Sequence, residues 1–193
     1  MEKVFVATGN TGKIEEMKPL FDEKGIELVQ IQVDISEIQA TDVEDVAERK
    51  VRDSRREALD EEIIDENDTL IVEDTGFFIE AIGGFPGAQA AVFDKTAGAG
   101  KLLNLIEDEE ETEAYFKTAI GVFHDGAVEV FTGKMAGRVP REKQGESHPH
   151  LPYNSYFIPE DAENSLAEDQ DLKNNEFHRT RAVRKFLGWL ESL

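Results

Sequence analysis

Two short apolar runs, residues 4–7 and 69–72, constrain most strongly what this chain can fold into. Each run ends in polar residues with a glycine close behind, and the run at 69–72 is typical of a strand buried in a sheet. The first run is followed by Ile14, Met17, Leu20 and Phe21, which recur at helical spacing. The N-terminal segment therefore predicts a strand, a polar turn and a helix, in that order.

The rest of the chain continues this alternation of strands and helices. The predicted strands cover residues 4–7, 28–35, 69–72, 114–123, 128–131 and 153–158. Four helices are predicted. The first begins near residue 14, the second covers 43–59, the third passes through 101–105 and the fourth ends near 190. Because Asp125-Gly126 predicts a hairpin between two of the strands, we expect an α/β protein with a mixed sheet. No linker divides residues 1–193, so we expect a single domain.

The charge balance limits the partners of the protein. Acidic residues outnumber basic ones by 42 to 21, which gives a formal net charge of −21 at pH 7. Such a field repels phosphate, so we expect no nucleic acid or anionic lipid as a partner, and any phosphate ligand must be held locally. The hydrophobic content of 39% is enough for a packed core beneath an acidic surface. Two explanations fit this surface: adaptation to high intracellular salt, or the ordinary acidity of a mesophilic protein.

The chain contains no cysteine. Disulfides, thiolate metal sites and cysteine nucleophiles are therefore excluded. No apolar run approaches the ~18 residues of a membrane span, and the first residues lack a signal-peptide pattern. We expect a cytoplasmic protein that does not enter a membrane.

The first candidate site is the turn Thr8-Gly9-Asn10-Thr11-Gly12-Lys13. A strand that turns into a helix presents free N–H groups, and together with a lysine these form an anion site. The spacing is not that of a Walker A loop, because only two residues separate the glycines and Ile14 follows the lysine. A plain turn with Asn10 or Thr11 as the helix N-cap explains the same residues.

The second candidate site is Glu73-Asp74-Thr75-Gly76, which follows the strand at 69–72. Ligands of α/β proteins commonly bind at the carboxyl ends of strands. Two carboxylates beside a triphosphate suit Mg²⁺, which takes one or two carboxylates together with phosphate oxygens and waters. In so acidic a chain, an ordinary acidic strand end is the alternative.

Two weaker candidates lie toward the C-terminus. His148 and His150 lack a third ligand at metal-site spacing, which favours a loop. The cationic group Lys173, His178 and Arg179 stands out against the acidic composition, although such charges also complement an acidic surface.

Taken in order, these motifs resemble those of the non-canonical purine nucleoside triphosphate pyrophosphatases, also called inosine triphosphate pyrophosphatases. The single motifs are short, but their joint order and spacing are specific and cover nearly the whole chain. The matching stretches are Thr8-Gly9-Asn10 with Lys13, Glu37-Ile38-Gln39, Glu44-Asp45 with Ala47 and Lys50, Val72 to Gly76, Gly83 to Gly87, Ala114-Tyr115-Phe116, Phe131-Thr132-Gly133 with Gly137, Phe157-Ile158-Pro159, Ala167-Glu168, Lys173-Asn174 and His178-Arg179.

The resemblance implies an enzyme that hydrolyses deaminated purine nucleotides such as ITP, dITP and XTP to the monophosphate and pyrophosphate. It also implies a need for Mg²⁺, a long mixed sheet flanked by helices, two lobes with the nucleotide in the cleft between them, and a homodimer. These implications agree with the local anion and carboxylate sites described above.

Several residues fall on functional positions of that family. The resemblance implies that Asp74 helps to hold the metal and activate water, and the expected catalytic role of Lys13 is to offset charge on the departing pyrophosphate. Glu73 and Asp45 are the other expected metal ligands, and Asp45 stands where the family usually has Glu. The expected substrate-binding residues are Thr8, Asn10, Lys13, Lys50, Thr75, Tyr153, Asn154, Lys173, His178 and Arg179.

The departures from the family pattern concentrate in the base pocket. The family typically reads Gly-Phe-Gly-Tyr-Asp-Pro, whereas residues 150–155 read His-Leu-Pro-Tyr-Asn-Ser and lack the stacking Phe and the base-reading Asp. Phe177 replaces the usual Ser, and Gln89-Ala90 replaces Tyr-Ser. The Asn154 amide is able to accept from the N1–H of a deaminated purine and donate to its O6.

The same departures leave two alternatives. One is pyrophosphohydrolase chemistry on a different or broader set of nucleotides, which is favoured by Leu151, Pro152, Asn154 and Phe177. The other is a nucleotide-binding protein that hydrolyses poorly. Retention of Lys13, Lys50, Glu73 and Asp74 argues against this last alternative.

Overall fold

The computed structural model describes residues 2–36, 38–109, 112–146, 150–168 and 177–193. Its strands are β1 (Lys3–Ala7), β2 (Glu27–Ile31), β3 (Thr69–Ile79), β4 (Pro86–Gly87), β5 (Glu113–His124), β6 (Ala127–Arg138) and β7 (Ile158–Pro159). Its α-helices are α1 (Thr11–Glu23), α2 (Val43–Asp60), α3 (Ala90–Ala97), α4 (Leu102–Leu105) and α5 (His178–Leu190), and 3₁₀ turns cover Glu80–Ile82, Ala99–Lys101 and Pro152–Tyr156.

The strands form one mixed sheet in the order β2-β1-β3-β5-β6-β7, and β4 pairs with β3. β1 runs parallel to both β2 and β3, whereas β5 runs antiparallel to β3 and β6. The N-terminal strand–turn–helix unit and the hairpin at Asp125-Gly126 are both present. The expectation of an α/β protein with a long mixed sheet flanked by helices is therefore confirmed.

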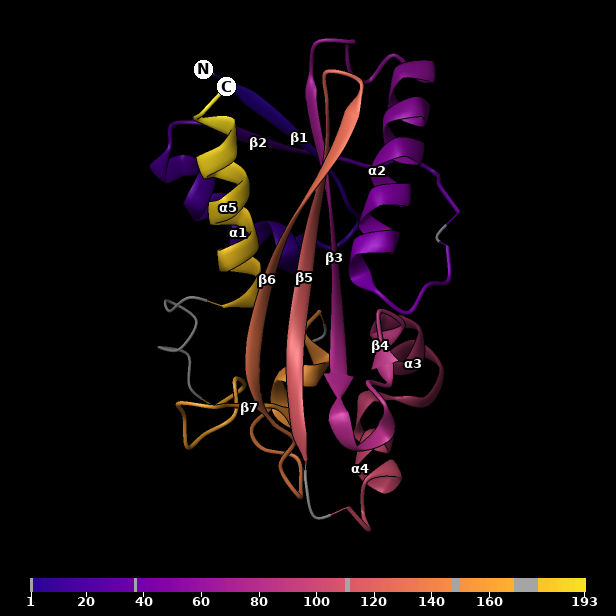
Figure 1. Ribbon diagram of the computed structural model, residues 1–193, viewed down its shortest axis with the longest axis vertical. Coiled ribbons are helices and arrows are strands. Elements are labelled where there is room, and N and C mark those ends of the chain that lie inside the picture. The colour runs from indigo at the N-terminus through magenta and orange to yellow at the C-terminus, as the bar shows by residue number, and fades with distance from the viewer. Residues whose placement is uncertain (1, 37, 110–111, 147–149, 169–176) are drawn as a thin grey trace.

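Helices cover both faces of one half of the sheet (Figure 1). α1 and α5 lie on one face, where Met17, Phe21 and Phe186 pack against the strands in one core cluster. α2 lies on the other face and packs through Val43, Ala47 and Val51. The other half of the long strands belongs to a third cluster, with α4 and the segment around Phe157 packed on Phe77 and Phe116.

The unequal lengths of β1 and β3 leave an open edge in the sheet. β1 pairs with β3 only from Thr69 to Val72, and β4 pairs with β3 only at Phe77 and Phe78. Within the described part of the chain, the segment Glu73 to Gly76 therefore has β5 on one side and no strand on the other. This gap in the sheet, directly beyond the end of β1, becomes the candidate active site.

Several predicted boundaries were wrong. The strand at 69–72 continues to Ile79, because Leu70–Ile79 pairs with β5 along its whole length, so Glu73 and Asp74 lie within a strand and not at its end. Residues 152–156 form a 3₁₀ turn where a strand was predicted. The strand predicted at 28–35 ends at Ile31. The helix predicted to pass through 101–105 is separated from α3 by a break at Gly98, whose φ is 84°.

Among the described residues, no helix is long and apolar enough to span a membrane.

Candidate active site

A cavity of about 500 Å³ occupies the open edge of β3. The turn after β1, the segment before α2, the start of α3 and the segment 150–154 all contribute to its walls. Among the described residues, three cationic side chains line it, Lys13, Lys50 and Arg179, against two acidic ones, Asp74 and Asp94. This local balance is the reverse of the chain as a whole, which has 21 basic and 42 acidic residues. The cavity thus presents cationic side chains to a ligand although the chain as a whole is acidic.

The turn between β1 and α1 is held in place by its own side chains. The Asn10 side chain accepts hydrogen bonds from the backbone N–H groups of Gly12, at 2.9 Å, and Lys13, at 3.4 Å, which makes Asn10 the N-cap of α1. The hydroxyl of Thr8 accepts from the N–H of Asn10 at 3.1 Å. The N-cap interpretation is therefore confirmed for Asn10, and the capped turn also lines the cavity.

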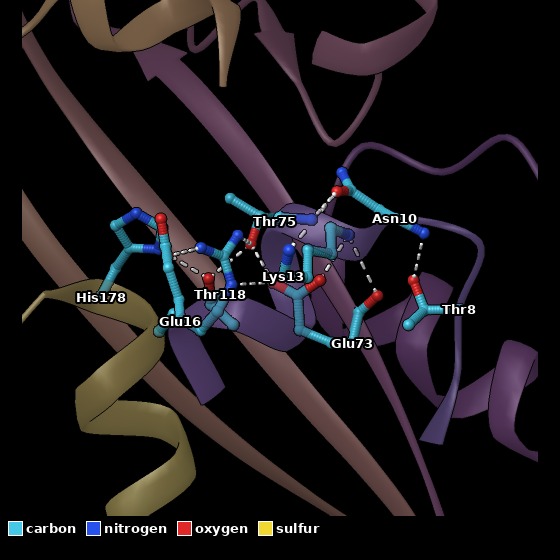
Figure 2. Close-up of polar contacts among 10 residues, drawn as sticks. Thr8, Asn10, Lys13, Glu16, Glu73, Thr75, Thr118 and His178 are labelled. Atoms are coloured by element: carbon cyan, nitrogen blue, oxygen red, sulfur yellow. Dashed lines mark hydrogen bonds and ion pairs between the residues drawn. The ribbon is translucent and has the colours of Figure 1, made fainter. Parts of the chain in front are cut away.

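Glu73 is fully buried and faces two cations (Figure 2). Its side chain forms ion pairs with Lys13 and with Nε of Arg179, the latter at 3.0 Å, and it accepts a hydrogen bond from the hydroxyl of Thr75. Burial alone would raise the pKa of Glu73, but the charges of Lys13 and Arg179 outweigh it and hold that pKa well below its ordinary value. Glu73 is thus an ionised carboxylate in the interior of the protein.

Arg179 is the other centre of this ionic network. Its guanidinium also pairs with Glu16 of α1, and Nη2 donates to Thr75 at 3.3 Å. Burial disfavours the charge of Arg179, but Glu73 and Glu16 stabilise it and raise its pKa. A buried charge with two carboxylate partners ties the start of α5 to both β3 and α1.

His178 begins α5 against the sheet. Gly133 of β6 permits this approach, since a Cβ there would come within 2.0 Å of the His178 carbonyl oxygen. The imidazole ring stacks on Phe116 with centroids 4.9 Å apart, and its Nδ1 lies 2.6 Å from the hydroxyl of Thr118. Burial, followed by the charge of Arg179, lowers the pKa of His178 well below its ordinary value, so the ring is neutral.

Asp74 projects to the opposite face of β3 from Glu73, because side chains alternate along a strand. It lines the cavity together with Thr75 and with Lys50 of α2. Phe77 lies three residues further along β3 and pairs with Phe116 of β5, and both rings line the cavity. At ~3.3 Å per residue, Phe77 lies roughly 10 Å along β3 from Asp74 and on the opposite face of the strand, and the cavity reaches both faces across the open edge of β3. The cavity therefore has a charged end and an aromatic end.

Tyr153 and Asn154 line the cavity from the 3₁₀ turn. The ring of Tyr153 packs on Phe77 with centroids 5.2 Å apart, and its hydroxyl donates to the Ala90 carbonyl at 2.5 Å. Asn154 is anchored through its backbone, whose carbonyl accepts from the N–H of Ala167 at 3.2 Å. Tyr153 thus supports the wall that presents Asn154 to the cavity.

Most of the expected site residues come together in this cavity, but not all. Asp45 is exposed on α2 and does not belong to the described cavity lining, and Glu73 lies behind that lining with its carboxylate on the two cations. Lys173 and His148 lie outside the described residues, as does Glu37. The residues that line the cavity are Thr8, Asn10, Lys13, Lys50, Asp74, Thr75, Tyr153, Asn154, His178 and Arg179.

Two polar residues of the network were not expected from the sequence. Glu16 lies one helical turn after Lys13, and this spacing places both on one face of α1. Thr118 lies between Phe116 and Ile120 on the same face of β5. A hydroxyl between two apolar residues of a buried face is a signal that the sequence contains.

Known proteins match this chain over nearly its whole length. The chain is 35% identical to the dITP/XTP pyrophosphatase of Pyrococcus horikoshii over 190 residues, which covers 98% of this chain and 97% of that protein. It is 36% identical to the dITP/XTP pyrophosphatase of Hyperthermus butylicus, with 97% of this chain and 94% of that protein covered.

Solved structures show the same fold. The HAM1 protein of Coxiella burnetii superposes with a TM-score of 0.82 at 21% identity and covers 100% of both chains. The Ham1 protein of Staphylococcus aureus superposes with a TM-score of 0.80 at 24% identity and covers 99% of both chains. The model of the Ham1 family matches residues 4–189. This chain belongs to the Ham1 family.

Proposed function

We propose that this protein is a single-domain nucleoside triphosphate pyrophosphatase that hydrolyses deaminated purine nucleotides, ITP, dITP and XTP, to the monophosphate and pyrophosphate. The observation that carries the proposal is the two-ended cavity. Lys13, Lys50 and Asp74 line its charged end, and Phe77 and Phe116 line its aromatic end. The names of the full-length relatives, dITP/XTP pyrophosphatase, support the same substrate class.

The charged end suits a triphosphate. The ammonium of Lys13 has three N–H donors. One faces the carboxylate of Glu73, and a second donates to the backbone carbonyl of Glu73 at 3.4 Å. The third donor is left for a phosphate oxygen, and the N-terminus of α1 adds its own positive dipole. Glu73 fixes Lys13 in this position, so Lys13 stabilises charge on the departing pyrophosphate without first having to become ordered.

The donor chemistry of this end also fits Mg²⁺. Asp74 supplies one carboxylate to the cavity, and Mg²⁺ commonly takes one or two carboxylates and completes its shell with phosphate oxygens and waters. Among the described residues, no group of three or more His, Cys, Asp or Glu is placed to hold a metal ion, and in this proposal phosphate oxygens and waters complete the shell. When bound, Mg²⁺ neutralises phosphate oxygens. Asp74 would hold the ion and orient water for attack at the α-phosphorus, whereas we assign Glu73 to positioning and not to the metal.

The aromatic end suits a purine. Phe77 and Phe116 supply apolar surface, and His178, Arg179 and Asn154 supply polar groups around it. We propose that Asn154 contacts the edge of the base where the family carries a carboxylate. We also propose that the protein is a cytoplasmic homodimer, as the resemblance implies.

Release of pyrophosphate from ITP, XTP, dITP, GTP and ATP tests the proposed function. We expect turnover with Mg²⁺ and none with EDTA, and a kcat/KM for ITP that exceeds that for ATP on the order of 10²-fold, because buried polar groups reject the wrong base edge. The assay is run at low and high KCl, since adaptation to high salt predicts higher activity at high KCl, whereas ordinary acidity does not.

The outcomes of this assay separate the alternatives. A ratio of ITP to ATP near one would indicate a broader specificity and contradict the assignment to deaminated purines. Binding of every nucleotide without pyrophosphate release at any KCl concentration would indicate a nucleotide-binding protein.

A further inference from the structure

Three consecutive hydrogen bonds connect Glu73 to His178 across the sheet (Figure 2). The hydroxyl of Thr75 contacts the Glu73 carboxylate and lies 2.5 Å from the hydroxyl of Thr118. The hydroxyl of Thr118 lies 2.6 Å from Nδ1 of His178. The path therefore runs from β3 to β5 and then to the first residue of α5.

Glu73 fixes the direction of these hydrogen bonds. Because Lys13 and Arg179 both pair with Glu73, its carboxylate is ionised and can only accept. Thr75 must then donate its single hydroxyl proton to Glu73. The two lone pairs of the Thr75 hydroxyl accept from Nη2 of Arg179, at 3.3 Å, and from the hydroxyl of Thr118.

The same logic sets the tautomer of His178. Thr118 has donated its only hydroxyl proton to Thr75, so it can only accept from the imidazole. Nδ1 of His178 therefore carries the proton. The reverse direction would turn a lone pair of Thr75 toward the ionised Glu73 carboxylate at close range, which is repulsive.

The other ring nitrogen of His178 is consequently an acceptor. The ring is neutral in its buried position, and Nε2 has no proton when Nδ1 has one. His178 lines the cavity with its ring stacked on Phe116, and within the described part of the chain Nε2 makes no hydrogen bond. Nε2 is therefore available to a ligand at the aromatic end of the cavity.

We propose that Thr118 is a specificity-determining positioning residue: it holds His178 in the Nδ1–H tautomer, so that Nε2, in place of the Asn154 amide oxygen, accepts the N1–H of a lactam purine, while the Asn154 amide donates to O6. This inference rests on the proposed function. Hypoxanthine and xanthine carry a proton at N1, whereas adenine presents a lone pair there, which would face the lone pair of Nε2. Guanine also carries N1–H, so the device separates lactam purines from adenine and leaves guanine to other groups.

The Thr118→Val variant tests the proposal, because it keeps the shape of the side chain and removes the hydroxyl. Without that hydroxyl, His178 is free to protonate Nε2 and donate to N1 of adenine. We expect the ratio of kcat/KM for ITP over ATP to fall about tenfold, because one buried hydrogen bond would no longer discriminate between the two bases. Thr118→Ser retains the hydroxyl and should retain the ratio. Thr132→Val on the neighbouring strand is the matched control and should change nothing.

A spectroscopic readout separates positioning from mere structure. Long-range ¹H–¹⁵N correlation spectra of the histidines distinguish Nδ1–H from Nε2–H. We expect Nδ1–H for His178 in the wild type and in Thr118→Ser, and a shift toward Nε2–H in Thr118→Val. If the valine variant does not fold, the wild-type spectrum and the serine variant still decide the question.

Two results would overturn the inference. One is an Nε2–H tautomer for His178 in the wild type, and the other is an unchanged ratio of ITP to ATP in folded Thr118→Val. A wild type that already hydrolyses ATP as well as ITP would contradict the proposed function instead, and the tautomer would still be read independently from the spectrum.

Discussion

The Asp74→Asn variant is expected to lose at least ~10²-fold in kcat for ITP, the scale on which a preorganised charged group contributes to catalysis. Asn keeps the shape of Asp but removes the charge that holds a divalent cation and orients water. Asp74 is only partly buried and lines the cavity, so its replacement should leave the melting temperature nearly unchanged. Steady-state release of pyrophosphate and thermal unfolding of the same samples measure both effects.

The matched control for this variant is Asp125→Asn. Asp125 lies in the turn between β5 and β6 with a φ of 47°, a conformation that Asn adopts readily. The control removes one negative charge at a site remote in the fold and should retain full activity. Near-wild-type turnover in folded Asp74→Asn would show that the metal and the attacking water are held elsewhere.

The Glu73→Gln variant is expected to be both destabilised and inactive. Its side chain is fully buried and balances Lys13 and Arg179, so the uncharged amide leaves Lys13 without its carboxylate partner and Arg179 with Glu16 alone. Breaking a buried ion pair by removing one partner lowers the free energy of unfolding by about 3–5 kcal/mol. Activity should fall as well, because Lys13 loses its fixed position at the charged end of the cavity. Denaturant unfolding and pyrophosphate release measure the two losses.

Glu27→Gln provides the comparison for this variant. Glu27 is exposed on β2 and lies 3.7 Å from Lys3, and such a surface pair contributes roughly 0–1 kcal/mol. If Glu73→Gln were as stable as Glu27→Gln, Glu73 would not be the ionised centre of the network. The assignment of Glu73 to positioning would then be wrong.

Local patterns in the sequence predicted much of the charged end of the cavity. The turn from Thr8 to Lys13 is predictable because its cap and its strand and helix lie within a few residues of one another. The hairpin at Asp125-Gly126 is predictable for the same reason. The length of β3 was not predictable from local sequence. Its second half becomes a strand because it pairs with β5, which lies about 40 residues later in the chain.

Side-chain direction explains the differences at Glu73 and Asp45. Once β3 continues past Val72, alternation sends Glu73 to one face, where its carboxylate pairs with Lys13 and Arg179, and Asp74 to the other. On α2, Val43, Val46 and Ala47 face the core, and this phase leaves Asp45 exposed. That phase is visible in the sequence. The partners of Arg179, Thr118 and His178 come from four separate elements, and only the folded chain brings them together.

Hydrolysis of ITP in ¹⁸O-labelled water tests the central claim most directly, because it identifies the phosphorus atom that water attacks. Attack at the α-phosphorus places the label in IMP and releases unlabelled pyrophosphate. We expect IMP that carries one ¹⁸O per turnover, by mass spectrometry of the products. Label in pyrophosphate would show attack at the β-phosphorus, and release of labelled inorganic phosphate with IDP would show attack at the γ-phosphorus; either result would contradict the assignment as a pyrophosphatase of this mechanism.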